Sequence, residues 1–218
     1  MITLSNLKTI TLVCLIGVGL MVQGSRAHAA GSETLTVAGG CFWCAEADFE
    51  AVEGVTNAVS GYTGGTTTDP TYKQVTGGDT GHYEAVQITF DPEVISARAL
   101  LDMFFRSVDP TDAGGQFCDR GDSYRTAIFA APDQIAAAAD AKQDAQAELG
   151  QEIVTPVLDA TQFYPAEEYH QDYATGSGLV LTRFGPKSQA NAYKAYREAC
   201  GRDQRVKQLW GSAAPFAG

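Results

Sequence analysis

The chain has 218 residues, of which 44% are hydrophobic and 19% are charged, and this composition excludes a disordered tail or a collagen-like rod. Five cysteines are too few for a disulfide scaffold, and 23 glycines with 8 prolines are too few for a low-complexity chain. The formal net charge of -11 repels the phosphates of nucleic acids, so we expect a folded domain without a nucleic-acid partner.

The first residues have the pattern of a secretory signal. Lys8 precedes an apolar run from Ile10 to Val22, and Ala27-His28-Ala29 then matches an A-x-A cleavage site. A membrane span needs about 20 apolar residues, which is longer than this run. We therefore expect export with removal of residues 1–29, which leaves one domain over residues 30–218 in the periplasm, without membrane attachment.

A short strand, a tight turn and a helix open the mature chain. Leu35 to Ala38 is an apolar run stopped by Gly39-Gly40, and the segment FWCAEADFEAVEG that follows has helical composition and ends at Gly54. Acidic side chains stand in the front half of this helix, where the helix dipole favours negative charge. The turn places Cys41 at the start of the helix.

Two strands joined by a long loop come next. Val55 to Tyr62 alternates loosely and runs into a polar, glycine-rich stretch that ends at Gly81, and a loop of this length inside a compact domain is usually functional. Tyr83 to Phe90 alternates cleanly, which predicts a strand. Its apolar face carries one carboxylate, that of Glu84.

The remaining pattern alternates helices with strands and then becomes irregular. We expect a helix over 96–108, a loop over 111–123, a strand over Tyr124–Ala130, a helix over Asp133–Leu149, a strand over Ile153–Leu158, and a tail from Glu167 onward that is helical in pieces. This order predicts an α/β fold in which helices pack on a mixed sheet. The order of the strands in the sheet does not follow from the pattern.

Cys41 and Cys44 form a C-x-x-C motif at the start of a helix, where the dipole and the free backbone N–H groups favour a thiolate. One alternative is half of a zinc site, but no second C-x-x-C or H-x-H supplies the other ligands. Another is a static disulfide between these two cysteines in an oxidising compartment. We favour a reactive pair, and we expect neither a metal nor a cofactor.

Three further residues define a pocket beside this thiol. Phe42 and Trp43 are neighbours on a helix and point about 100° apart, so they cannot both enter one core layer, and at least one faces the thiol. An acid such as Glu84 on a buried face is either paired or has a raised pKa, and a neutral carboxyl donates a proton. The alternatives are two core aromatics and a structural glutamate bridging to a loop N–H or to Arg125.

These groups together suit the reduction of a polar X=O bond beside a methyl group. If the X=O bond is that of a sulfoxide, a hydrogen bond to the oxygen makes the sulfur electrophilic, a thiolate attacks it, and the oxygen ends on cysteine as a sulfenic acid. A second cysteine then condenses with that acid to a disulfide. The phenols of Tyr72 and Tyr124 are available as hydrogen-bond donors.

Several segments resemble the A type of the peptide methionine sulfoxide reductases. They extend from Gly39 to Arg205 and are GGCFWCAEADFE, SGYTGG, DPTYKQV, GDTGHYEAVQITFDP, GGQFCDRGDSYRTAIF, FYPAEEYHQDY and CGRDQR. The resemblance implies a two-layer α/β sandwich around a ferredoxin-like core. It also implies reduction of the S epimer of methionine sulfoxide, free or in oxidised proteins, by a monomeric enzyme that thioredoxin or a thioredoxin-like reductant recycles.

The same resemblance assigns roles to single residues. It makes Cys41 the nucleophile and Glu84 the acid, and it gives the other roles as follows: Tyr72 and Tyr124 bind the sulfoxide oxygen, Phe42 and Trp43 hold the methyl group, Asp119 is the polar residue of the DRG match, and His170 lies near the substrate backbone. The sequence by itself also allows His170 to be a surface residue.

The cysteine that resolves the sulfenic acid stays open. Many members of the family carry glycine at the position of Cys44, and some carry two recycling cysteines in a tail that here has only Cys200. We expect Cys200 to resolve the acid, with Cys44 second and Cys118 third. Two rival functions remain, a general thiol-disulfide oxidoreductase and an exported module that binds methionine-containing peptides without turnover.

Overall fold

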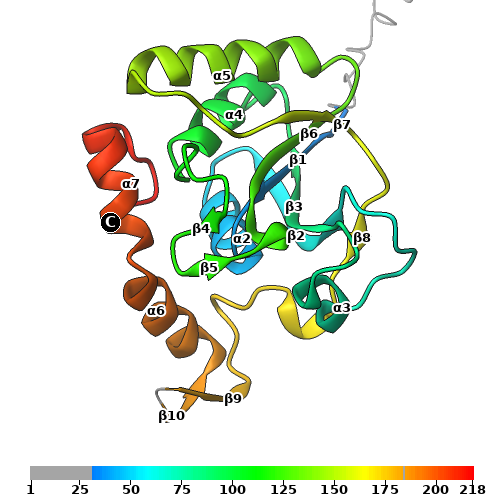
Figure 1. Cartoon of the computed structure of the whole chain (residues 1–218), viewed down its shortest axis with the longest axis vertical. Helices are drawn as coiled ribbons and strands as arrows, with labels where there is room; N and C mark the ends of the chain where they lie inside the picture. Colours follow the sequence, from blue (N-terminus) through cyan, green and yellow to red (C-terminus); the bar gives the residue numbers. More distant parts are fainter. Residues whose placement is uncertain (1–30, 184) are drawn as a thin grey trace, which may run out of the picture. The chain divides into compact units, whose positions relative to one another are not determined.

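A computed structural model describes residues 31–183 and 185–218, so the predicted signal peptide lies outside the described residues. A six-stranded sheet with the order β7-β6-β1-β3-β2-β8 forms its centre (Figure 1). The strands are β1 (Glu33–Gly39), β2 (Val55–Thr63), β3 (Tyr83–Phe90), β6 (Thr126–Ala130), β7 (Val157–Asp159) and β8 (Tyr164–Pro165). Only β6 and β7 pair in parallel within this sheet, whose other pairs are antiparallel, so the sheet is mixed as predicted.

The ferredoxin-like core is formed by four of these strands and two helices. Along the chain they follow the order β1-α2-β2-β3-α4-β6, with α2 at Phe42–Glu50 and α4 at Ala97–Phe105, and in the sheet the strands lie in the order β6-β1-β3-β2. The predicted fold class is confirmed, and the structure supplies the strand order that the sequence did not.

The main hydrophobic core lies between one face of the sheet and the helices α2, α4 and α5 (Ile135–Leu149). Alternation along β3 decides which residues enter it: Val86, Ile88 and Phe90 are fully buried there. A smaller cluster, which includes Tyr83 and Phe129, is formed by side chains on the opposite face of the same strands. The helices therefore form one layer and the sheet forms the other.

Both predicted loops contain short elements. The first holds α3 (Tyr72–Gly77), which carries a capping box between Thr71 and Gln74. The second holds the hairpin of β4 (Gly115–Gln116) and β5 (Asp119–Arg120) and then the short helix η1 (Asp122–Tyr124).

The C-terminal part is more regular than the predicted tail. After η2 (Glu168–His170) it forms a hairpin of β9 (Leu179–Thr182) and β10 (Gly185–Ser188), followed by α6 (Gln189–Cys200) and α7 (Arg202–Trp210). The two helices, orange to red in Figure 1, meet at Gly201, whose φ of 68 favours glycine. Within the described residues, no helix has the length and apolar character that crossing a bilayer requires.

Candidate active site

Cys41 lies in the turn between β1 and α2, directly before the first helical residue. Gly40 precedes it with φ 81, and a Cβ at Gly40 would lie 2.6 Å from Gln116 Cβ, so the turn requires glycine. Cys41 and Cys44 are both free thiols and both buried, so the alternative of a Cys41–Cys44 disulfide does not describe this structure. The predicted position of Cys41 at a helix start is confirmed.

The surroundings of Cys41 favour the thiol form, which differs from the thiolate that its position at the helix start predicts. Burial raises the pKa of Cys41 well above its ordinary value, and a hydrogen bond to Cys44 raises it further. The same bond lowers the pKa of Cys44. Desolvation therefore outweighs the helix dipole at Cys41 as long as the site is closed to water.

Glu84 joins the sheet to the N-terminus of α2. Its Oε2 accepts the backbone N–H of Phe42 at 3.1 Å, so the carboxyl caps the first turn of the helix that carries the cysteines. The alternative of a structural glutamate named a loop N–H or Arg125 as its partner; the observed partner is instead the N–H of the first helical residue, and the Arg125 guanidinium donates to Asp122 O and lies over the Tyr83 ring.

The second oxygen of this carboxyl is unused. Glu84 is 1% exposed, and its Oε1 has no hydrogen-bond partner within the described residues. Burial raises the pKa of Glu84 to about 8, although the hydrogen bond from the Phe42 N–H lowers it, and the nearby Asp119 adds a smaller increase. At neutral pH Glu84 is a neutral acid with a free oxygen, as its place on the apolar face predicts.

Tyr72 begins α3 in the first loop, and Tyr124 ends η1 although the sequence placed it at the start of a strand; both lie beside Glu84. Their hydroxyls lie close enough for each tyrosine to affect the pKa of the other. Burial raises the pKa of both, and the nearby Glu84 raises both further, so they remain neutral donors. Tyr72 is in turn held by Glu167 Oε1, which accepts its backbone N–H at 2.9 Å.

Phe42 and Trp43 lie in different surroundings, as their angle around the helix predicts. Phe42 is 1% exposed and packs into the main core against Tyr62 and Tyr72. Trp43 is only partly buried and stacks face to face on Tyr173, with ring centroids 3.7 Å apart. Trp43 is thus the member of the pair that borders the cluster around Cys41.

His170 is a buried residue and not a surface residue. It is 2% exposed, and its Nδ1 accepts the indole N–H of Trp43 at 3.1 Å. Burial lowers the pKa of His170 to about 4, so the ring is neutral and carries its proton on Nε2. That Nε2 is buried without a hydrogen-bond partner among the described residues, so its N–H is free to donate.

Asp119, on β5, is bound from the C-terminal helix α6. The Tyr196 hydroxyl donates a short hydrogen bond to Asp119 Oδ2. Burial raises the pKa of Asp119, and the bond from Tyr196 lowers it. Asp119 also lies close enough to Cys41 and Glu84 to raise the pKa of each.

Cys118 and Cys200 form a disulfide in this structure. Both are candidates for resolving the sulfenic acid by their sequence positions, but this pairing was not predicted. Their Cα atoms lie 4.9 Å apart across a sequence separation of 82 residues.

Two aromatic residues of the site were missed from the sequence. Tyr173 stands in the HQDY segment that the resemblance quotes, but stacking on Trp43 leaves no periodic signal. Tyr196 precedes Cys200 by four residues, which places both on one face of a helix, and this spacing was the available signal.

A buried, free cysteine at a helix N-terminus, next to a neutral carboxyl and two phenols, defines a cysteine-dependent oxidoreductase. The family model described as peptide methionine sulfoxide reductase matches residues 33–213. The chain belongs to the peptide methionine sulfoxide reductase family and, by its relatives, to the A type, which confirms the resemblance seen in its motifs.

The relatives cover nearly the whole chain. Peptide methionine sulfoxide reductase MsrA 2 of Caulobacter vibrioides is 46% identical over 204 residues, which are 92% of this chain and 98% of the relative. MsrA of Bacillus licheniformis is 46% identical over 182 residues, 82% of this chain and 94% of the relative.

Solved structures show the same fold. Reduced Mxr1 of Saccharomyces cerevisiae has a TM-score of 0.64 at 34% identity, over 69% of this chain and 88% of that chain. Methionine sulfoxide reductase A of Corynebacterium diphtheriae has a TM-score of 0.63 at 31% identity, over 71% of this chain and 79% of that chain.

Proposed function

We propose that this enzyme reduces the S epimer of methionine sulfoxide, free or in oxidised proteins, through a sulfenic acid on Cys41. The observation that carries the proposal is the pair of groups left unused at the site: a buried free thiol, and a neutral Glu84 carboxyl whose Oε1 has no partner among the described residues. A sulfoxide oxygen bound at Glu84 gives that atom its partner.

The proton balance needs only these two groups. Glu84 protonates the sulfoxide oxygen, Cys41 attacks the sulfur, and the oxygen moves to Cys41 as S–OH while methionine leaves. The proton of the Cys41 thiol replaces the one that Glu84 gave up. Tyr72 and Tyr124 hold the oxygen during the transfer, and both are neutral donors.

The aromatic residues supply the pocket for the substrate methyl group. Trp43 is fixed from two sides, by the stack with Tyr173 and by the bond to His170 Nδ1. With the oxygen held at Glu84 and the methyl group against Trp43, only one epimer presents its sulfur to Cys41. The family resemblance supports S as that epimer, a position for His170 beside the substrate backbone, and Asp119 as a further polar contact.

A second cysteine condenses with the sulfenic acid, which releases water and forms a disulfide. Cys200 is the first candidate and acts only when its bond to Cys118 is reduced. Cys44 is the second candidate and already hydrogen-bonds to Cys41. A thioredoxin-like dithiol then restores the enzyme, in the periplasm if residues 1–29 direct export.

The experiment uses the mature protein, dithiothreitol and racemic free methionine sulfoxide, with chiral chromatography of the remaining sulfoxide. We expect only the S epimer to disappear, and equal consumption of both epimers contradicts the pocket. A single turnover of fully reduced Cys44→Ser and Cys200→Ser variants, followed by mass mapping, identifies the resolving cysteine. The variant that lacks it accumulates Cys41 sulfenic acid, and the other forms a Cys41 disulfide.

A further inference from the structure

Two links join helix α6 to the β4–β5 hairpin, one helical turn apart. Tyr196 and Cys200 are four residues apart and therefore lie on the same face of α6. Two consecutive residues of the hairpin contact this face. Cys118 forms the disulfide with Cys200, and Asp119 accepts a hydrogen bond from the Tyr196 hydroxyl. A covalent bond and a hydrogen bond thus hold one edge of α6 against the β4–β5 hairpin.

This edge of α6 covers the reactive thiol. Cys41 is 7% exposed and packs in a cluster with Ala192 and Tyr193 of α6. Tyr196 packs against the same cluster and meets the Trp43 ring edge-on, with centroids 6.3 Å apart. The Tyr196 ring therefore lies beside Trp43, the residue proposed to contact the substrate methyl group. Its hydroxyl is hydrogen-bonded to Asp119.

The disulfide itself faces solvent. Cys118 is exposed and Cys200 is half-buried. Both line a hollow of about 310 Å³ together with Asp109, Asp112, Phe117 and Arg205. A small dithiol therefore reaches this disulfide while Cys41 stays covered, and the more accessible sulfur is that of Cys118.

We propose that Cys118 and Cys200 form a second redox centre whose disulfide keeps α6 closed over Cys41, and that an external dithiol opens the site by reducing it. The thiolate of the dithiol attacks Cys118 Sγ, the bond to Cys200 breaks, and Cys200 leaves as a thiolate that takes up a proton. The second thiol of the dithiol then releases Cys118. Two electrons and two protons pass to the protein, and the dithiol becomes a disulfide.

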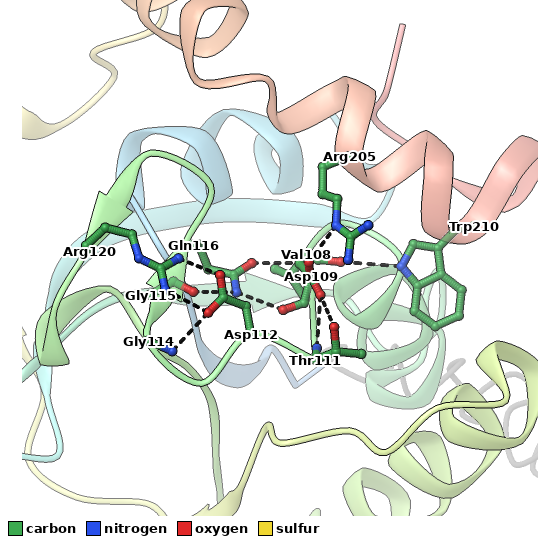
Figure 2. A network of polar contacts seen from close by, with 10 residues as sticks. All are labelled: Val108, Asp109, Thr111, Asp112, Gly114, Gly115, Gln116, Arg120, Arg205 and Trp210. Atoms are coloured by element: carbon green, nitrogen blue, oxygen red, sulfur yellow. Dashed lines mark hydrogen bonds and ion pairs between the residues drawn. The ribbon is translucent and has the colours of Figure 1, made fainter.

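Other contacts hold the rest of α6 in place, so reduction of the disulfide loosens only the edge of α6 that carries Tyr196 and Cys200. Arg197 Nη1 lies 2.7 Å from Asp48 Oδ1, which keeps α6 on α2 without the disulfide. The hairpin loop has its own polar network, in which Arg120 pairs with Asp112 and the Gln116 amide bonds to the backbone of Asp109 (Figure 2).

Helix α7 is held to the same loop by other contacts. Arg205 Nε lies 2.7 Å from Asp109 Oδ2, and the Trp210 indole donates to Val108 O at 3.3 Å, as Figure 2 shows. Reduction therefore leaves the hydrogen bond from Tyr196 to Asp119 as the remaining link at this edge, and α6, α7 and the hairpin keep their other contacts.

The proposal rests on the proposed function in one respect, the role of Cys41 as the reactive thiol, and its test is independent of turnover. The rate at which iodoacetamide alkylates Cys41 is followed by tandem mass spectrometry, which separates Cys41 from Cys44. We expect alkylation in the Cys118→Ser/Cys200→Ser variant, and in wild type with this disulfide reduced, to be at least about tenfold faster than in oxidised wild type.

Two tyrosine substitutions distinguish the effect of the hydrogen bond from that of the disulfide. Tyr196→Phe keeps the disulfide and loses the bond to Asp119, so its oxidised form should be alkylated faster than oxidised wild type but more slowly than the reduced enzyme. Tyr169→Phe, at a tyrosine that is 58% exposed and outside α6, should match wild type.

Equal Cys41 alkylation rates with the disulfide formed and reduced would overturn the proposal, even if methionine sulfoxide is reduced normally. If reduction of the disulfide accelerates Cys41 alkylation but the enzyme consumes no methionine sulfoxide, the proposed closure of α6 over Cys41 is supported and the proposed function is wrong. If the double variant does not fold, the comparison between oxidised and reduced wild type decides.

Discussion

Replacing Glu84 with glutamine removes the acid and keeps its shape. The amide oxygen of the variant still accepts the Phe42 N–H, which Glu84 Oε2 accepts at 3.1 Å, so the cap of α2 is preserved. What is lost is the proton that the proposed reaction gives to the sulfoxide oxygen. We expect the chemical step to slow by roughly 10² to 10⁴, the range for lost general acid catalysis.

The same change has a predictable effect on stability. Folding raises the pKa of Glu84 from 4.5 to about 8, so between these values the folded state holds a proton that the unfolded state has lost. This stabilises the folded protein below pH 4.5, and the contribution is lost as the pH rises toward 8. At about 1.4 kcal/mol per pH unit, wild type should lose about 4 kcal/mol more than Glu84→Gln between pH 5 and pH 8.

Glu46→Gln is the matched control. Glu46 is 2% exposed on α2, and burial raises its pKa to about 7, but it does not belong to the proposed reaction. Its replacement should also flatten the dependence of stability on pH while leaving the chemical step within about twofold of wild type.

Urea denaturation at the two pH values measures the stability difference, and stopped-flow fluorescence of a single turnover measures the chemical step. The prediction for Glu84 also gives a pH profile, because the rate of wild type should fall above about pH 8 as the carboxyl ionises. A Glu84→Gln variant with an unchanged single-turnover rate would refute the role of Glu84 as the acid. An unchanged dependence of stability on pH would refute its buried neutral state.

Three further substitutions test other parts of the account. Trp43→Ala should lower kcat/KM for the S epimer by roughly tenfold or more, through lost packing of the methyl group, with no gain for the R epimer in a chiral assay. Asp48→Ala removes the buried one of the two carboxylates that pair with Arg197 and leaves Asp203, so it should cost about 1–3 kcal/mol of unfolding free energy in urea, whereas an unchanged free energy would contradict a stabilising pair. Gly115→Ala should destabilise the hairpin by about 1–3 kcal/mol, seen as a lower Tm, because φ is 132 and the new Cβ would lie 2.3 Å from Asp119 O; an unchanged Tm would contradict this.

The sequence predicted the parts of the site that depend on local pattern. Alternation in the segment Tyr83 to Phe90 predicted both the strand β3 and the buried carboxyl of Glu84, since a period of two places every second side chain on one face. The glycine pair before Cys41 predicted the turn and the helix start in the same way.

The sequence did not predict what depends on contacts between distant segments. The hairpin of β9 and β10 was missed because apolar and polar residues do not alternate along its sequence. The leucines of β9 also face outward, with exposed fractions of 81% for Leu179 and 86% for Leu181. The pairing of Cys118 with Cys200 across 82 residues requires the packing of α6 on β5, which no local pattern contains. The raised pKa of Cys41 depends in the same way on its burial among segments that are distant in the sequence.

The most direct test of the central claim follows the oxygen atom. A Cys44→Ser/Cys118→Ser/Cys200→Ser variant keeps Cys41 as the only cysteine after residue 29, so a sulfenic acid formed there has no resolving partner. Methionine sulfoxide labelled with a heavy oxygen isotope is added in one equivalent without a reductant, and the protein is mapped by mass spectrometry. The account predicts one equivalent of methionine and the labelled oxygen on Cys41, and the same protein with Cys41→Ser should form neither. Formation of methionine without labelled oxygen on Cys41 would contradict it.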